Sequence, residues 1–135
     1  MAEAERFSVR VYYEDTDFSG NVYHTAYLKF FERARTEFLR AHGVHHSELA
    51  GRGVAFAVRS MGIEFEAAAH IDDLLSVVTE PVAATGARLS LKQSIWRDAT
   101  RLVTAELVVV AINATGRPTR LPAAVLEAAR GESAA

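Results

Sequence analysis

The chain has 135 residues, half of them hydrophobic and 24% charged, which predicts a single globular domain over residues 1–135 rather than a disordered segment. Its formal net charge of −2 argues against nucleic acid as a partner, because non-specific binding to a polyanion needs a broad basic field. The lack of cysteine excludes disulfides and a cysteine nucleophile, while an acidic start and the lack of any run of about 18 apolar residues predict a cytoplasmic protein with no membrane span.

The first predicted element is a strand from Arg6 to Tyr13, in which apolar and polar residues alternate with a period of two. Its buried face consists of Phe7, Val9, Val11 and Tyr13. After a polar stretch at residues 14–21, the apolar spacing changes to three and four, which predicts a helix from Val22 to His42. The buried side of this helix consists of Val22, Ala26, Tyr27, Phe30, Phe31, Ala34, Phe38 and Ala41. Gly43 is expected to end it, because glycine readily adopts the left-handed conformation that follows a helix.

The rest of the chain predicts a helical turn from Ser47 to Ala50, four strands and a final short helix from Ala123 to Arg130. The strands cover residues 54–67, 73–83, 86–97 and 101–113. Their connections are short, and short connections join antiparallel strands, because a parallel pair needs a crossover of about a dozen residues or more. The sequence therefore predicts an α+β fold of two layers, with one long helix packed on a curved antiparallel sheet of about five strands.

The densest polar cluster runs from Glu14 to His24, between the first strand and the long helix. Asp15, Asp17 and Ser19 are similar to the opening of a calcium-binding EF-hand loop, but Ala26 stands where that loop needs a bidentate glutamate. Two other groups lack the spacing of known transition-metal motifs, namely Asp15, Asp17 and His24, and the histidines His42, His45 and His46. The sequence therefore predicts no metal site.

The same cluster precedes the N-terminus of a long helix, where backbone N–H groups lack an intrahelical acceptor and the helix dipole is positive. Such an end can stabilise the oxyanion that develops on a thioester carbonyl near Tyr23 and His24, with each preorganised donor contributing about 3–4 kcal/mol. A neighbouring aspartate can then attack the carbonyl or activate water. The alternative is structural, since carboxylates that favour a helix dipole contribute about 0.3–1 kcal/mol at exposed sites. The residue pattern alone leaves both interpretations open.

Three stretches of the chain carry a resemblance to a known family. They are Val11-Tyr12-Tyr13-Glu14-Asp15-Thr16-Asp17, then Gly20 with Val22-Tyr23-His24 and Tyr27, and Glu32-Arg33-Ala34-Arg35-Thr36-Glu37. These residues resemble hotdog-fold acyl-CoA thioesterases, most of all the YbgC branch near the 4-hydroxybenzoyl-CoA thioesterases. The match is dense over residues 7–43 and weaker but collinear as far as Arg120-Leu121-Pro122. The resemblance implies a hotdog fold, in which a five-stranded antiparallel sheet wraps a long central helix, and a homodimer or homotetramer.

The resemblance also implies roles for individual residues. Asp17 would be the catalytic carboxylate, as nucleophile or as general base, and the backbone amide of His24 would face the thioester oxygen. The His24 side chain would orient the substrate or the carboxylate, or would be only a hydrogen-bonded residue of the helix start. Tyr23 belongs to the same catalytic helix start. Substrate-binding positions would be Tyr13, Gly20, Val22 and Tyr27, although the two tyrosines also fit a role in the core. No cofactor is implied, because coenzyme A is part of the substrate.

Coenzyme A brings phosphates, so basic side chains are expected near the mouth of the pocket. One group of candidates shares a face of a predicted strand and consists of Arg88, Ser90 and Lys92. A second group follows the last strand and consists of Arg117 and Arg120, of which Arg120 also matches the family pattern. The alternative for all of these charges is an ordinary solvated surface.

Three functions follow from these residues, and an acyl-CoA thioesterase is the leading one. A second is a non-catalytic acyl-CoA-binding or envelope-associated protein, since relatives are linked with the Tol-Pal machinery and a fold does not fix a function. A third is a hydratase or dehydratase that would use His24 with Glu32 across a dimer, but the histidine-phenylalanine-proline pattern of such dehydratases is missing. Asp17 favours hydrolysis, because a pure binder has no use for a carboxylate beside an anionic ligand. Residues 66–70 are rich in alanine, whereas relatives often carry proline there. The size of the pocket and the acyl group of the substrate are therefore not predicted.

Overall fold

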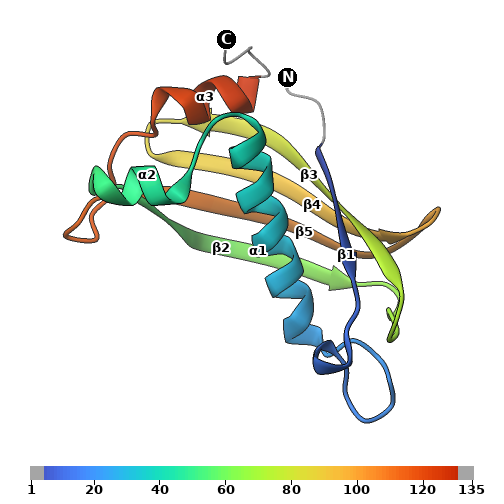
Figure 1. Cartoon of the computed structure of the whole chain (residues 1–135). Helices are drawn as coiled ribbons and strands as arrows, with labels where there is room; N and C mark the ends of the chain where they lie inside the picture. The colour runs from blue at the N-terminus through green and yellow to red at the C-terminus, as the bar shows by residue number, and fades with distance from the viewer. Residues whose placement is uncertain (1–4, 131–135) are drawn as a thin grey trace.

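The protein is described by a computed structural model over residues 5–130. Within this range the strands are β1 (Glu5–Arg10), β2 (Ala55–Phe65), β3 (Leu74–Thr85), β4 (Arg88–Arg97) and β5 (Thr100–Ile112), and the α-helices are α1 (His24–Ala41), α2 (His46–Gly51) and α3 (Ala123–Arg130) (Figure 1). The strands form one sheet in the order β1-β3-β4-β5-β2, and all neighbours pair antiparallel. The predicted α+β fold, with one long helix on a five-stranded antiparallel sheet, is confirmed.

The long helix α1 crosses one face of the sheet, and apolar side chains from both layers form the core (Figure 1). The helix contributes Phe30, Phe31 and Phe38, which are almost completely buried. Alternate residues of the strands face them, among them Val77 and Ile95. Complete burial of such a side chain contributes about 1.5–3 kcal/mol, so this contact between the layers is the main stabilising feature of the fold. The N-terminal end of α1 lies at one end of the molecule, and α2 and α3 lie at the other.

The predicted end of the first strand is wrong. The strand was expected to continue to Tyr13, but β1 ends at Arg10 and the chain then forms a short 3₁₀ turn over Tyr13–Asp15. The Asp15 carboxylate accepts a hydrogen bond from the Tyr12 amide at 2.9 Å, so a local side-chain bond replaces the ladder bond that a longer strand would need. As a result the Tyr13 side chain is 82% exposed and does not enter the core.

The predicted start of the long helix is also corrected. Val22 was expected to begin it, but α1 begins at His24, because the backbone of Val22 bridges to Thr16 and donates to the Ala69 carbonyl. Along the helix the predicted buried side is confirmed except at Ala41, which is exposed, and Leu39 is buried in addition. The remaining predicted elements are confirmed to within two residues at each end.

A buried polar cluster ties the middle of α1 to the middle of the sheet. Gln93 of β4 is 2% exposed, and its Nε2 donates to the Phe31 carbonyl at 3.0 Å and to the Thr79 hydroxyl at 2.9 Å. Its Oε1 accepts a hydrogen bond from the Arg35 guanidinium at 3.0 Å. Every polar atom of the Gln93 side chain is therefore used, and the bonds fix the helix against one strand.

Replacement of Gln93 by alanine should lower the free energy of unfolding by about 1–3 kcal/mol, because the buried Thr79 hydroxyl and the Arg35 guanidinium lose their partner. Denaturant unfolding of Gln93→Ala measures this loss. Ser90→Ala, on the other face of β4, is the matched control and is expected to change the same quantity by no more than about 0.5 kcal/mol. Equal stability of the two variants would show that the cluster does not hold the layers together.

Candidate active site at the start of the long helix

The loop before α1 is a small hairpin with Asp17 near its tip. Thr16 and Val22 form a bridge across it, the Asp17 amide donates to the Asn21 carbonyl at 2.9 Å, and the Gly20 amide donates to the Asp17 carbonyl at 3.0 Å. Gly20 has a φ of 83°, a conformation that glycine adopts without strain. The turn that presents Asp17 therefore depends on a glycine three residues later.

A second segment, residues 66–73 between β2 and β3, lies against this hairpin. The Val22 amide donates to the Ala69 carbonyl at 2.8 Å, and the Ile71 amide donates to the Gly20 carbonyl at 3.0 Å. Asn21 and His70 form an isolated bridge between these two bonds. The position of the hairpin is therefore set by a loop that is about 50 residues away in the sequence, and no local pattern reveals this contact.

The Asp17 carboxylate is exposed, and Ser19 is its main hydrogen-bonding neighbour. Its Oδ1 accepts hydrogen bonds from the hydroxyl and from the amide of Ser19, the latter at 2.8 Å. The bond from the Ser19 hydroxyl, followed by the bond from its amide, holds the pKa of the Asp17 carboxyl below its usual value. Asp17 is therefore an anion at neutral pH, with its second oxygen free to act as a nucleophile or as a base.

The first turn of α1 presents backbone donors beside this loop. The Tyr23 amide donates to the Asp15 carbonyl at 2.9 Å and is thereby occupied. Within the described part of the chain, the amides of His24 and Thr25 have no acceptor. They lie at the positive end of a helix of 18 residues, which is a favourable place for an oxyanion.

Aromatic rings surround the same helix end. The His24 ring lies 4.6 Å from the Tyr23 ring and 6.5 Å from the Phe65 ring, and the Phe65 ring lies 5.8 Å from the Tyr27 ring. Tyr23 and Phe65 are half exposed, whereas Tyr27 is 3% exposed. The arrangement offers an apolar surface next to the free His24 amide.

Two of these aromatic positions modify the expectations from the sequence. Tyr27 lies in the core, which agrees with the second role considered for it, and its hydroxyl accepts a hydrogen bond from the Ala69 amide at 2.9 Å. Burial raises the pKa of the Tyr27 phenol, so the hydroxyl stays protonated. Phe65 was not among the predicted site residues. Its signal in the sequence is an aromatic residue at the end of a strand, which is too common to single it out.

The structure brings together seven of the predicted site residues at one end of the molecule. They are Tyr13, Asp17, Gly20, Val22, Tyr23, His24 and Tyr27. Ser90 and Lys92 lie elsewhere, on the face of β4 that points away from α1. Arg88 begins β4, and Arg120 is next to Leu121, whose amide donates to the Gly86 carbonyl at 2.9 Å. Arg88 and Arg120 therefore flank the β3–β4 turn, at the end of the sheet opposite the start of α1 (Figure 1). The structure does not bring this pair to the residues around Asp17, and its role as a phosphate site stays a prediction.

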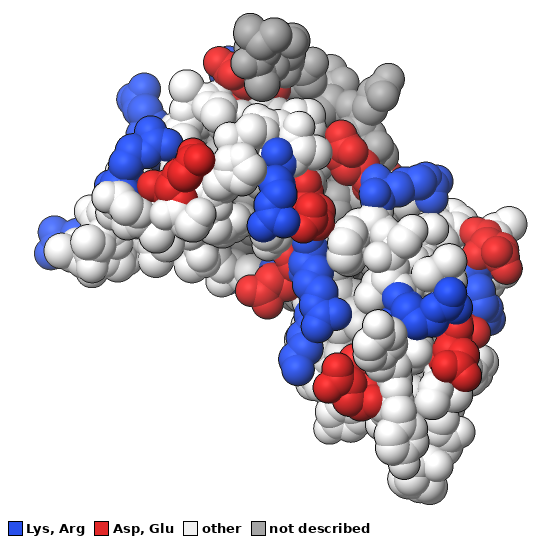
Figure 2. Space-filling model, viewed as in Figure 1, with Lys and Arg blue, Asp and Glu red and all other residues white. Residues whose placement is uncertain are grey.

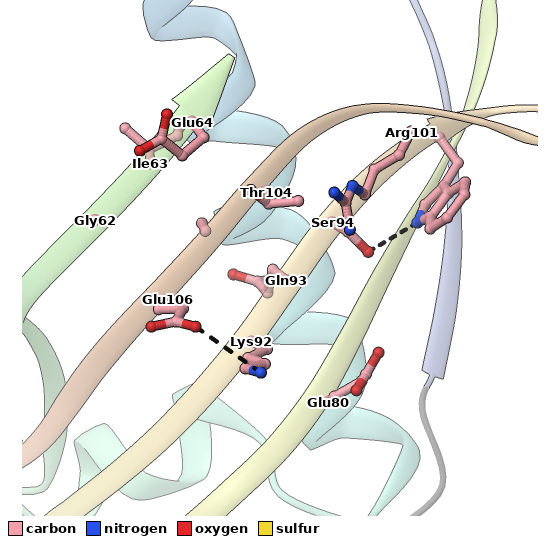
Figure 3. A pocket seen from close by; sticks show the side chains of 12 residues that line it. Gly62, Ile63, Glu64, Glu80, Lys92, Gln93, Ser94, Arg101, Thr104 and Glu106 are labelled. Carbon is pink, nitrogen blue, oxygen red and sulfur yellow. Dashed lines mark hydrogen bonds and ion pairs between the residues drawn. The ribbon is translucent and has the colours of Figure 1, made fainter. Parts of the chain in front are cut away.

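Lys92 lies in a polar hollow on the outer face of the sheet (Figure 3). The hollow has a volume of about 590 Å³, and its lining includes Glu64, Glu80 and Glu106. The Lys92 ammonium is 3.9 Å from the Glu106 carboxylate. A phosphate placed here would meet several carboxylates, and this setting weighs against the phosphate role predicted for Lys92.

Three further features of the described residues are the distribution of surface charge, the grouping of metal-binding side chains and the apolar character of the helices. Basic and acidic side chains alternate over the face that includes α1, with no extended field of one sign (Figure 2). Across residues 5–130, no cluster of three or more His, Asp or Glu side chains is arranged to hold a metal ion. In the same range no helix has the length and apolar character needed to cross a membrane.

Comparisons with known proteins agree on one family. Residues 11–129 match the family model described as "Thioesterase-like superfamily". The chain is similar to the acyl-CoA thioester hydrolase YbgC of Escherichia coli, with 43% identity over 90% of this chain and 92% of that protein. It is 44% identical to the acyl-CoA thioesterase YbgC of Haemophilus influenzae over 79% of each chain. A solved structure of a probable thioesterase from Bartonella henselae superposes with a TM-score of 0.86 and 45% identity, and covers 89% of this chain and 100% of that one.

Proposed function

The chain belongs to the thioesterase-like superfamily, and we propose that it hydrolyses acyl-CoA thioesters at the N-terminal end of α1. The observation that carries the proposal is the free His24 amide, which lies at the positive end of a long helix beside the hairpin of Asp17. A binding protein has no need for an ionised carboxylate next to an electron-rich ligand. A hydrolase needs such a carboxylate together with a donor for the developing oxyanion.

The reaction requires two groups of the protein and one water molecule. The His24 amide donates a hydrogen bond to the thioester oxygen and stabilises the negative charge that develops there. The Asp17 carboxylate either attacks the carbonyl carbon, so that a mixed anhydride forms and is then hydrolysed, or takes a proton from an attacking water. In both routes the carbon–sulfur bond breaks, coenzyme A leaves as a thiolate that gains a proton, and the acyl group leaves as a carboxylate.

The residues next to the start of α1 can bind the acyl end of the substrate. The half-exposed rings of Tyr23 and Phe65 offer an apolar surface to the acyl group, and Tyr27 supports Phe65 from the core. Gly20 and Val22 shape the hairpin of Asp17, and Tyr13, whose ring is exposed, lies in the turn before it. Arg88 and Arg120, with Arg117 in the preceding turn, are the candidates for the phosphates of coenzyme A. They lie at the end of the sheet opposite the start of α1 (Figure 1), so they would reach a substrate bound there only from a partner subunit. No further cofactor is needed for this chemistry.

The apolar surface around the site supports a homodimer or homotetramer. The exposed large side chains at this end are Tyr12, Tyr13, Phe18, Tyr23, Phe65, Ile71 and Leu74. Phe18, next to Asp17, is fully exposed. Clustered apolar groups of this size are uncommon on monomers and are usual in interfaces between subunits.

The cytoplasmic location inferred from the sequence remains a prediction.

Thiol release tests the proposal. The protein is fractionated by size exclusion with light scattering, and the oligomeric peak is assayed with short-chain, long-chain and aryl acyl-CoAs. We expect one class to be turned over with equal amounts of thiol and free acid formed, and this class identifies the acyl group. A properly folded protein that releases no thiol from any of them would contradict the proposal and leave an acyl-CoA-binding role.

The pH dependence of the reaction should depend on Ser19. Its hydroxyl is the main cause of the low pKa of Asp17, so Ser19→Ala should raise this pKa, and the acidic limb of the kcat/KM profile should move to higher pH. Because the low pKa comes from the folded protein, its contribution to stability is present above the unfolded pKa and is lost as the pH falls through the folded value. Ser47→Ala, on the exposed surface of α2, is the control. An unmoved acidic limb in Ser19→Ala would show that Asp17 does not set it.

A further inference from the structure

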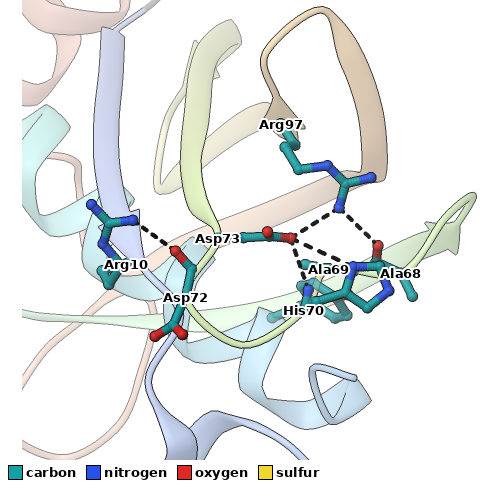
Figure 4. Close-up of polar contacts among 8 residues, drawn as sticks. Arg10, Ala68, Ala69, His70, Asp72, Asp73 and Arg97 are labelled. Carbon is teal, nitrogen blue, oxygen red and sulfur yellow. Dashed lines mark hydrogen bonds and ion pairs between the residues drawn. The ribbon is translucent and has the colours of Figure 1, made fainter. Parts of the chain in front are cut away.

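An ion pair that plays no part in the chemistry above joins the 66–73 segment to the end of β4 (Figure 4). One guanidinium nitrogen of Arg97, at the end of β4, is 2.9 Å from the Asp73 carboxylate and donates to the Ala68 carbonyl at 3.2 Å. The same Asp73 oxygen accepts a hydrogen bond from the His70 amide at 2.9 Å. Arg97 therefore contacts both ends of the segment from 68 to 73, through the Ala68 carbonyl and the Asp73 carboxylate.

Further contacts hold this segment in an unusual conformation. Asp72 has a φ of 73°, a left-handed conformation that is uncommon for a residue other than glycine and persists where the surroundings enforce it. Its carbonyl accepts a hydrogen bond from the Arg10 guanidinium at 2.7 Å. From the other side the Tyr27 hydroxyl accepts the Ala69 amide. The segment is thus fixed by side chains from β1, α1 and β4.

The fixed segment is the one that holds the hairpin of Asp17. Ala69 lies between the two residues that Arg97 contacts, and its carbonyl accepts a hydrogen bond from the Val22 amide. The Ile71 amide donates a hydrogen bond to the Gly20 carbonyl. We propose that Arg97 and Asp73 are positioning residues, whose ion pair fixes residues 68–73 and through them the placement of Asp17 relative to the His24 amide. This inference rests on the proposed function, because it assigns the pair a role in the rate of that reaction and none in substrate binding.

The contact has the properties that such a role needs. The Arg97 and Asp73 side chains are 32% and 22% exposed, so the pair is partly shielded from solvent. Partial burial by itself would raise the pKa of the Asp73 carboxyl, but the bonds from the His70 amide and Arg97 outweigh it and hold this pKa below its usual value. The carboxylate is therefore charged at neutral pH and accepts both bonds at once. A displacement of about 1 Å at a reacting group can cost about 100-fold in rate.

The test compares Asp73→Asn and Arg97→Met with the wild-type protein, using Arg97→Lys as the conservative variant. We expect kcat to fall between about 10- and 100-fold in the first two, with KM changed by less than about twofold, because the reacting groups and not the substrate contacts are displaced. Arg97→Lys keeps the charge and should recover part of kcat. Arg40→Met, which removes an exposed ion pair with Glu37 on α1, is the matched control and should leave kcat unchanged.

Hydrogen exchange at the Val22 and Ile71 amides provides a readout that does not depend on activity. In Asp73→Asn and Arg97→Met these two amides should exchange at least about tenfold faster, while amides in the middle of α1 should not change. Unchanged exchange at both amides would overturn the inference, as would faster exchange with an unaffected kcat. Full turnover by Asp17→Asn would instead refute the proposed catalytic residue, and the exchange rates would then still decide whether the pair fixes the hairpin.

Discussion

Asp17→Asn should lower kcat for acyl-CoA hydrolysis by at least about 100-fold, the scale expected when a nucleophile or a general base is removed. The asparagine is isosteric, and its side-chain oxygen can still accept the bonds from the Ser19 hydroxyl and amide. The hairpin should therefore keep its shape while the carboxylate is lost. Steady-state thiol release measures the effect, and KM should change little because the charge is not used to bind the substrate.

Asp98→Asn is the matched control for this variant. Asp98 lies in the β4–β5 turn with a φ of 53°, a conformation that asparagine tolerates well. The change of charge is the same and the site is not touched, so kcat should stay at the wild-type value. Equal turnover by Asp17→Asn and Asp98→Asn would mean that another group performs the chemistry.

His24→Pro should lower kcat by about 100- to 1,000-fold, because proline has no N–H and one oxyanion donor is worth this much. His24 is the first residue of α1, where proline is well accepted. The preceding residue, Tyr23, has an extended backbone with φ −68° and ψ 137°, as a residue before proline requires. Since the His24 amide has no acceptor among the described residues, its removal breaks no hydrogen bond of the fold.

His24→Ala separates the amide from the side chain. This variant keeps the N–H and loses the imidazole, so its kcat should fall much less than that of His24→Pro. Circular dichroism and thermal unfolding of both variants confirm that α1 is intact. Equal losses in the two variants would assign the effect to the imidazole and would contradict the role of the amide.

The elements that could be predicted from the sequence are those whose burial pattern is strong and regular. The apolar stripe of Phe30, Phe31 and Phe38 predicts α1. The alternation of apolar and polar residues over 86–97 predicts β4. Both patterns reflect contact between the two layers, and this contact also determines the fold. The tail helix from Ala123 to Arg130 was predicted with its correct bounds.

Errors occurred where a local or a distant polar contact competes with these patterns. Tyr13 continues the alternation of the first strand, but the bond between the Asp15 carboxylate and the Tyr12 amide ends that strand first. Val22 fits the spacing of the helix, yet its amide is taken by Ala69 from another loop. Periodicity reports which side chains are apolar, and it contains no information about which backbone donors are already used.

The candidate site could be predicted only in part for the same reason. The polar cluster before a long helix indicated a place for an oxyanion, and the family resemblance selected Asp17 over Asp15. The sequence could not show that the Tyr23 amide is occupied and that the His24 amide is free. Nor could it show that Arg97 and Asp73 clasp the neighbouring loop, since these contacts join segments far apart in the chain.

The central claim is that the Asp17 carboxylate and the His24 amide act on one thioester carbonyl. The most direct test is kcat of the double variant Asp17→Asn/His24→Pro beside the two single variants, with the same acyl-CoA. Groups that act as a unit give strongly non-additive losses. We therefore predict that the double variant is only slightly slower than the slower single variant. A loss equal to the product of the two separate losses would show that the two groups contribute independently, and would contradict their action as one unit on the carbonyl.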